Sequence, residues 1–322
     1  MGTKQYGRKV SILVGQSGGA ATELSELRCV FKISRGDLQT PNSARVRVYN
    51  VSETTRQRIE KEFTRLVVQA GYTGNFGIIF DGTIKQVRRG RESQTDTYLD
   101  ITAADGDSAY NFAVVNKTLA AGSTSADHVA AAVAAMNPFG VTQGYVPTLS
   151  TNPLPRGKVM FGMARDFMRS VSKTNQTVWS IQDGKAIMVP ETSYMPGDIP
   201  EITSETGMVG LPEQTQNGIT VKMLLNPNVK ISQLIKINNA SVQRYEYSLN
   251  VGQQAQNELI QHQAKLQDDG FYYVMTAEHS GDTRGNEYYT DVICLAADAT
   301  VLPKQFINRG EVPPENVIKK FG

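Results

Sequence analysis

The sequence predicts a mainly β chain that carries a small α+β insert. Apolar residues alternate with polar ones, or run over strand lengths, in the first hundred residues and again after residue 190. The 322 residues include 28 Gly with many Thr, Val, Ile and Tyr, a composition that favours strands joined by turns. Between the two strand-rich regions, two segments have helical patterns. These observations together predict two β regions separated by an α+β region.

The first region, residues 1–105, is expected to form a compact β domain with one helix. In ARVRVYNV, Val46 and Val48 point to one face and the arginines to the other, which is the period of a half-buried strand. SETTRQRIEKEF predicts a helix with Ser52 or Thr54 as its N-cap. The other expected strands lie in KVSILVG, LRCVFKISRG, RLVVQAGY, GIIFDGTIKQV and TYLDITAADGD.

The second region, residues 106–190, is expected to be the α+β insert. ADHVAAAVAAM predicts a helix with Ser125 as a candidate cap, and MARDFMRSVSKT predicts a second helix. TVWSIQDGKAIMVP predicts a hairpin that turns at Asp183-Gly184, because this dipeptide readily adopts the positive φ of a tight turn.

The third region, residues 191–299, is again strand-rich, and residues 300–322 are expected to form an extended C-terminal arm. A Gln-rich segment at 251–269 fits an exposed helix or a loop, and the sequence leaves both open. Because the first and third regions have similar sizes and patterns, we expect two related barrels flanking the insert.

Charge and apolar patterning exclude several classes of protein. With 33 Lys and Arg against 31 Asp and Glu, the formal charge is +2, which argues against nucleic acid or an anionic membrane as the main partner. No apolar run is long enough to cross a bilayer, and the polar start is unlike a signal peptide, so we expect a soluble chain made in a cytoplasm with no stable membrane insertion. Cys29 and Cys294 sit in separate apolar runs, which predicts two buried thiols.

The stretch AEHSGDTRGNEYYTDVICL raises the question of catalysis. His279 has Asp282 and Glu287 nearby in sequence, which is the basis of a hydrolase hypothesis, but no local motif supplies a nucleophile or an oxyanion site. Alternating residues on both sides favour a hairpin whose polar residues form the turn. The chain has three His and no HEXXH spacing, so we expect no catalytic residue, no metal site and no cofactor.

Other polar or aromatic groups have both a structural and a binding interpretation. KQVRRGR places Lys85, Arg88, Arg89 and Arg91 within seven residues, which fits a solvated strand end or a contact with phosphates. The two Tyr-Tyr pairs, at 272–273 and 288–289, fit cross-strand packing or a stacking platform for sugars or bases. GQSGGAAT lacks the GK[ST] ending of a phosphate loop and is predicted to be a turn.

Several phrases, in order, resemble the baseplate hub proteins of tailed bacteriophages. VRVYNVSETTRQRI, VVQAGYTGNFGIIFDGTIKQV and TYLDITAADGDSAY are similar to the N-terminal domain of that family. MLLNPNVKISQLIKI and GFYYVMTAEHSGDTRGNEYYTDVICL are similar to later phrases of the same hubs, with Ser232 or Gln233 where Gly is common and Tyr288 or Tyr289 where Trp is usual. The resemblance covers most of residues 8 to 297.

The resemblance implies two tail-tube-like antiparallel β barrels flanking a small α+β domain. It also implies a homotrimeric ring that joins a sixfold tail tube, or a tube-initiator protein, to a threefold central spike and frames the DNA channel. Tape measure and surrounding baseplate proteins are further expected partners, with DNA only in transit. The expected location is the virion tail baseplate, assembled in the host bacterial cytoplasm.

The hypothesis is therefore a structural hub and not an enzyme. Lys85, Arg88, Arg89, Arg91, Asp282 and Arg284 are its candidate intersubunit or lumen contacts. The alternatives are a phage-borne cell-wall or capsule hydrolase and a carbohydrate-binding tail module.

Overall fold

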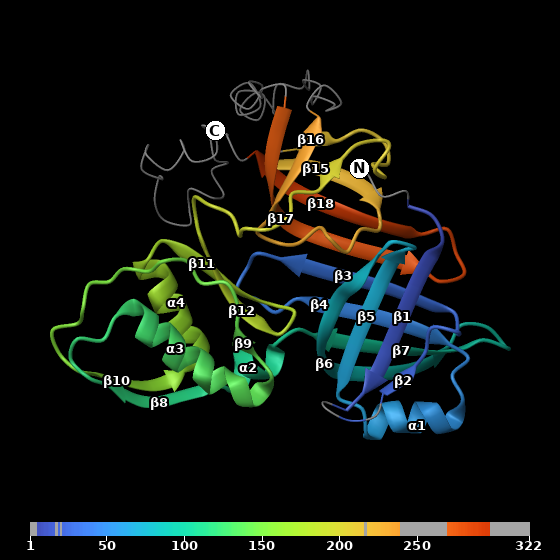
Figure 1. The fold of residues 1–322 in the computed structure, drawn as a ribbon. Helices are drawn as coiled ribbons and strands as arrows, with labels where there is room; N and C mark the ends of the chain where they lie inside the picture. Colours follow the sequence, from blue (N-terminus) through green and yellow to red (C-terminus); the bar gives the residue numbers. More distant parts are fainter. Residues whose placement is uncertain (1–4, 17–18, 20, 216–217, 239–268, 297–322) are drawn as a thin grey trace, which may run out of the picture.

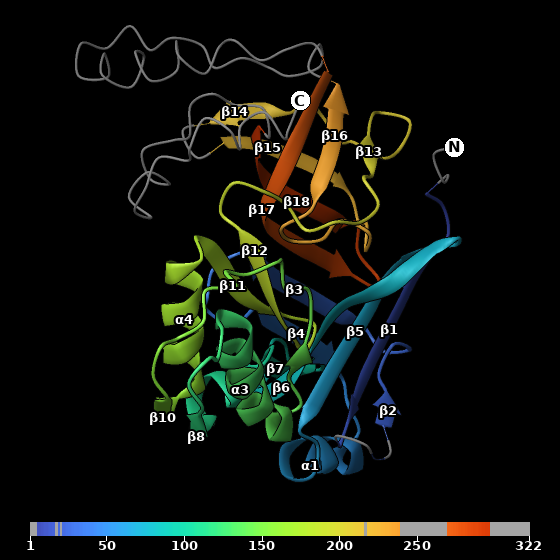
Figure 2. The ribbon, with the colours of Figure 1, turned by 60° about the vertical axis from the view of Figure 1, so that its left-hand side comes forward.

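A computed structural model describes residues 5–16, 19, 21–215, 218–238 and 269–296 of the chain. The fold is mainly β with a separate α+β insert, so the predicted fold class is confirmed. Figures 1 and 2 show the insert beside one continuous sheet to which both β regions contribute. Most of the Gln-rich segment and the predicted arm at 300–322 lie outside the described residues.

The described residues of the first β unit form seven strands and one helix. They are β1 (Arg8–Gly15), β2 (Ala21–Glu23), β3 (Cys29–Gly36), β4 (Ser43–Tyr49), α1 (Glu53–Lys61), β5 (Arg65–Tyr72), β6 (Asn75–Arg91) and β7 (Thr97–Ala104). Strand β4 has the predicted alternation, with Val46 and Val48 fully buried. Ser52 caps α1, because its hydroxyl accepts a hydrogen bond from the backbone N–H of Thr55, so the alternative cap Thr54 was wrong.

The insert contains two small sheets and three α-helices. Its elements are α2 (Asp107–Phe112), β8 (Val114–Leu119), α3 (Ser125–Met136), the 3₁₀ turn η1 (Asn137–Phe139), β9 (Thr142–Gln143), β10 (Lys158–Met163), α4 (Ala164–Thr174), β11 (Thr177–Gln182) and β12 (Lys185–Pro190). Strand β8 pairs with β10, and β9, β11 and β12 form the second sheet.

The insert has the predicted turn at Asp183-Gly184 but a different helix cap from the one expected. Hairpin β11–β12 turns at Asp183 and Gly184, which have φ of 52° and 71°, as predicted. The cap of α3 is Thr124 and not Ser125, because the Asp127 carboxylate accepts from the Thr124 backbone N–H at 2.7 Å. Neither the β8–β10 pair nor α2 was predicted, since the two paired strands lie far apart in the sequence and α2 has only six residues.

The described residues of the second β unit form six strands. They are β13 (Glu201–Ile202), β14 (Glu213–Thr215), β15 (Gly218–Leu224), β16 (Leu234–Asn238), β17 (Asp269–Asp282) and β18 (Tyr288–Ala296). Strands β17 and β18 form the predicted closing hairpin. The thiols of Cys29 and Cys294 are free and buried, as expected.

The two β units repeat the same topology and are joined edge to edge. In the first unit the spatial order is β3-β4-β7-β6-β5, and in the second it is β14-β15-β18-β17-β16. In both units, numbering the five strands along the chain gives the same spatial order: first, second, fifth, fourth and third. The second half of β17 pairs with β3 from Thr276–Gly36 to Asp282–Val30, which unites both units in one 13-stranded sheet (Figure 2).

Buried apolar side chains form three clusters, one in each unit. The largest fully buried side chain is Trp179, which belongs to the insert cluster. The first β unit's cluster also includes Leu225 and Tyr288 from the second unit, since the closing hairpin packs over the end of β1 and β5. The predicted domain boundaries after residues 105, 190 and 299 stay a prediction.

Candidate assembly surface

The second half of β6 is an open sheet edge. Its first half pairs with β5 as far as Thr83, and its second half pairs with β7 as far as Arg91. Among the described residues, no strand pairs with the other side of this second half. An open edge presents unpaired backbone N–H and C=O groups that can pair with another chain.

Basic side chains are concentrated on this open edge. Lys85 forms an ion pair with Asp107 at the start of α2. Arg88, Arg89 and Arg91 are exposed and form no ion pair within the described part of the chain. The structure therefore places the KQVRRGR cluster along an exposed strand. Its contact with a neighbour or with the lumen stays a proposal.

One end of the strand order in this sheet is the short strand β14. It pairs with β15 on one side, and no strand of the described chain pairs with its other side. Glu213 is exposed on this strand and has no ion-pair partner among the described residues. Sequence reasoning missed Glu213, because a three-residue strand has no usable periodicity.

The tip of the β17–β18 hairpin binds the first β unit of the same chain. The Asp282 carboxylate and the Arg28 guanidinium form an ion pair of 2.8 Å. Arg284 donates from its guanidinium to the Glu26 carbonyl at 2.9 Å and from its backbone N–H to Asp282 at 2.9 Å. Burial opposes ionisation of Asp282, but these hydrogen bonds outweigh it, so the pKa of Asp282 is lowered.

His279 lies in the core and not at a surface site. It is 1% exposed, its Nδ1 is 2.8 Å from the Thr290 hydroxyl, and its Nε2 has no partner among the described residues. Burial, with a smaller effect from Arg35, lowers the pKa of His279 to about 3, so the ring is neutral. The described structure shows no contact of His279 with Asp282 or Glu287, so the residues of the hydrolase alternative are not assembled into a site.

The tyrosine pairs contribute mainly to packing. Tyr272 and Tyr288 are completely buried. The Tyr288 hydroxyl donates to the Lys9 carbonyl at 2.7 Å and accepts from the Gly71 N–H at 2.8 Å, which ties the hairpin to β1 and β5. These two rings therefore support the packing interpretation and cannot serve a stacking platform. The described residues contain no cluster of three potential metal ligands, and no helix among them is long and apolar enough to cross a membrane.

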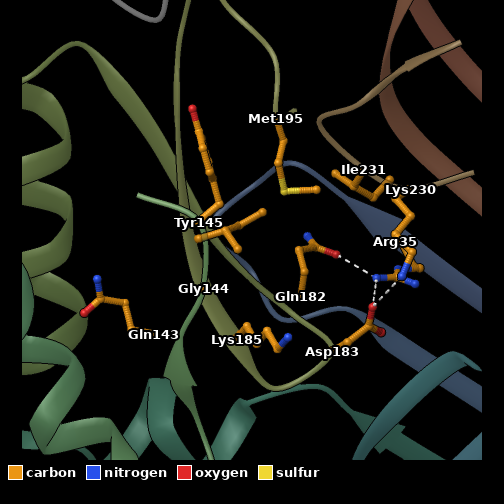
Figure 3. Close-up of a pocket in the computed structure, with 11 residues that line it drawn as sticks. Arg35, Gln143, Gly144, Tyr145, Gln182, Asp183, Lys185, Met195, Lys230 and Ile231 are labelled. Atoms are coloured by element: carbon orange, nitrogen blue, oxygen red, sulfur yellow. Dashed lines mark hydrogen bonds and ion pairs between the residues drawn. The ribbon is translucent and has the colours of Figure 1, made fainter. Parts of the chain in front are cut away.

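A cavity of about 450 Å³ lies where the insert meets both β units (Figure 3). Arg35 from β3 is 6% exposed and donates to the Asp183 carboxylate at 2.8 Å and to the Gln182 side chain at 3.2 Å. Lys230 from the second β unit lies 4.0 Å from the same carboxylate. The contacts of Arg35 and Lys230 with Asp183 therefore connect the three units at this junction.

Asp105 connects the first β unit to the insert. Its carboxylate accepts the backbone N–H groups of Asp183 at 2.6 Å and Gly184 at 2.9 Å, both in the β11–β12 turn. Burial raises the pKa of Asp105 to about 6, although these two hydrogen bonds favour the ionised form. Asp105, at the end of the first β unit, therefore has a structural function.

The comparison with protein families decides the identity. Residues 9–248 match the model of a family described as "Baseplate hub gp41". The chain belongs to this baseplate hub family. The hub is therefore a structural component of a phage tail, located in the virion baseplate. No curated protein sequence matches the hub.

Solved structures with similar folds include two tail proteins. The 43 kDa tail protein of prophage MuSo2 from Shewanella oneidensis is 8% identical, with a TM-score of 0.56 over 94% of the hub and 99% of that chain. A tail protein from Neisseria meningitidis MC58 is 11% identical, with a TM-score of 0.55 over 90% of the hub and 96% of that chain. A Francisella PdpA–VgrG complex matches 96% of the hub and 60% of that chain, at 7% identity and a TM-score of 0.51. At these identities the likeness shows the fold.

Proposed function

We propose that three copies of the hub form a ring that joins the sixfold tail tube to the threefold central spike. The internal repeat carries this proposal. Each chain contains two units with the same strand order, joined edge to edge through β3 and β17. Three chains would thus present six similar units to a sixfold tube while keeping the threefold symmetry of a spike. Closed rotational symmetry would also cover the open edge of each copy with a neighbouring copy.

The polar face of the continuous sheet supports a channel that DNA crosses. Residues that alternate with the buried ones carry both signs of charge on this face: Lys32, Arg45, Arg88, Lys222, Glu278 and Asp291. A mixed surface would hold a polyanion less tightly than a uniformly basic one, because fewer phosphate charges are neutralised. We propose that this face frames the lumen, so that DNA passes without stable binding.

The proposed partners are the tail tube or a tube-initiator protein on one side of the ring and the central spike on the other. Tape measure and surrounding baseplate proteins are proposed as further contacts, with assembly in the host cytoplasm. The similar fold of a chain in a PdpA–VgrG complex supports a scaffold that binds other proteins. We propose a structural role without catalysis, which the enclosed position of His279 supports.

Imaging of purified tails, with the hub located by a C-terminal tag, tests this proposal. We expect three copies in one ring at the junction of tube and spike. Light scattering after size-exclusion chromatography should show a species of three chains at high protein concentration. A hub that is absent from tails, or present there in a number other than three, would refute the proposal.

A further inference from the structure

We propose that the ring closes when the second half of β6 in one copy pairs with β14 of the next copy, which brings Arg88 beside Glu213 of the neighbouring copy. This inference rests on the trimeric ring proposed above and names its closing contact. The occupant of the open edge is thus a second copy of the chain. The reason is that the same junction already exists once inside each chain, between β17 and β3.

The long strands β6 and β17 are equivalent at the level of single residues. The register with the following strand shifts between Ile84 and Gln86 on β6, and between Val274 and Thr276 on β17. On β6 the shift follows directly after Thr83, the last residue that pairs with β5. On β17 it follows directly after Tyr273, the last residue that pairs with β16. The two shifts are 190 positions apart in the sequence, so each residue of β6 aligns with the residue of β17 that is 190 positions later. Arg88 then occupies the position of Glu278.

The rows of paired residues across the two units show that β14 is equivalent to β3. Each row contains one residue from each of four neighbouring strands, which are β3, β4, β7 and β6 in the first unit and β14, β15, β18 and β17 in the second. In the first unit the row is Lys32, Arg45, Thr102, Gln86, and in the second it is Glu213, Thr220, Ile293, Thr276. Glu213 therefore occupies the position of Lys32.

The junction inside the chain supplies the register for the junction between copies. Ser280 on β17 is directly opposite Lys32 on β3, and Glu278 lies diagonally from Lys32, with which it forms an ion pair of 2.6 Å. Transferred to the open edge, the same register places Gly90 opposite Glu213 of the neighbouring copy and Arg88 diagonally from it. Diagonal neighbours on one sheet face are within reach of long side chains.

The charges are complementary in both junctions, with their signs exchanged. Inside the chain the basic residue is on β3 and the acidic residue is on β17. Between copies the acidic residue, Glu213, would be on the strand equivalent to β3, and the basic residue, Arg88, on the strand equivalent to β17. Neither Arg88 nor Glu213 has an ion-pair partner in the described part of its own chain. A contact with another copy accounts for both unpaired charges.

A charge exchange tests the contact. Arg88→Glu and Glu213→Arg should each weaken association by about fivefold at every interface, because attraction becomes repulsion. The double variant R88E/E213R should restore the wild-type proportion of trimer and the assembly of tails. Lys61→Glu, on the exposed side of α1, makes the same charge change away from the edge and should have no effect. Single variants that assemble like the wild type would overturn this contact while leaving the ring intact.

Cross-linking provides a measurement that does not depend on the strength of one ion pair. Arg88→Cys combined with Glu213→Cys, treated with a short bifunctional maleimide, should give covalent dimers and trimers, whereas Lys61→Cys with Glu213→Cys should not. The native thiols are buried and do not interfere. Trimers that do not cross-link at this pair would overturn the inference alone. A wild-type chain that forms no ring in tails would overturn both proposals.

Discussion

Lys32 on β3 and Glu278 on β17 form an ion pair of 2.6 Å across the junction that unites the two β units. The hydrogen bond to Glu278 raises the pKa of Lys32, so the lysine is charged at neutral pH. Their side chains are 62% and 40% exposed, so solvent screens the pair. We therefore assign the pair mainly to the register of β17 on β3, with a small contribution to stability.

Exchanging these two charges measures that contribution. Lys32→Glu should lower the free energy of unfolding by about 0.5–1 kcal/mol, because attraction across the junction becomes repulsion. The double variant K32E/E278K should recover most of the loss. Urea unfolding followed by far-UV circular dichroism gives the numbers, with Lys61→Glu as the matched control. If the double variant is as unstable as the sum of its single variants, the two residues are not coupled.

The contribution of Asp105 to the free energy of unfolding should be larger in mild acid than at neutral pH. Its folded pKa of about 6 exceeds the ordinary value, so the folded state binds the proton more tightly than the unfolded state. Stability from Asp105 is thus complete below the unfolded pKa and decreases as pH rises from about 4 through 6. The change amounts to about 2–3 kcal/mol.

Asp105→Asn tests this effect. The amide offers one acceptor to two N–H groups, so the variant should lose about 1–3 kcal/mol near pH 7. The stability difference from the wild type should grow between pH 7 and pH 4, since only the wild type gains from protonation. Fluorescence of Trp179, which is the chain's one tryptophan and lies in the insert core, reports the unfolding. A difference that stays constant with pH would contradict the pKa shift.

His279 should have the opposite dependence on pH. Its folded pKa of about 3 is below the ordinary value, so stability is complete above about pH 6.5 and decreases as pH falls toward 3. His279→Leu removes the titrating group at similar volume. We expect a loss of about 1 kcal/mol at pH 7, because the Thr290 hydroxyl loses its hydrogen bond with His279 and keeps only the one from the Asn226 N–H, and a smaller loss of stability in acid than the wild type. Urea titrations at pH 7, 5 and 4 would show it. Equal acid sensitivity in both proteins would refute it.

The outcomes show what local sequence patterns encode in this fold. Alternation predicted the buried Val46 and Val48, and the Asp183-Gly184 dipeptide predicted its turn, because both depend on neighbours in sequence. The pairing of β17 with β3 joins residues more than 200 positions apart, so no local pattern contains it. For His279, the local sequence pattern led to a wrong hypothesis. Polar neighbours in sequence suggested a site, but the strand turns His279 into the core and Asp282 toward Arg28.

The hairpin tip contains two residues whose roles can be separated. Asp282→Asn removes the charge that pairs with Arg28 in a largely buried position, so we expect a loss of about 1–3 kcal/mol in the free energy of unfolding. Because the folded pKa of Asp282 is lowered, this difference should shrink as pH falls below about 4. Urea unfolding at pH 7 and pH 3.5 measures both effects. An unchanged difference at the lower pH would argue against the ion pair.

Arg284→Glu tests whether the same hairpin tip also contacts another subunit. Inside the chain Arg284 donates its guanidinium to one carbonyl, that of Glu26, so reversal of its charge should cost about 1 kcal/mol or less. We expect Arg284→Glu to unfold nearly like the wild type and yet to reduce tail assembly, because we propose this side chain as an intersubunit contact. Arg284→Ala, which removes the charge without reversing it, should have a smaller effect on assembly. Normal assembly of the Arg284→Glu protein would restrict Arg284 to its contact with Glu26.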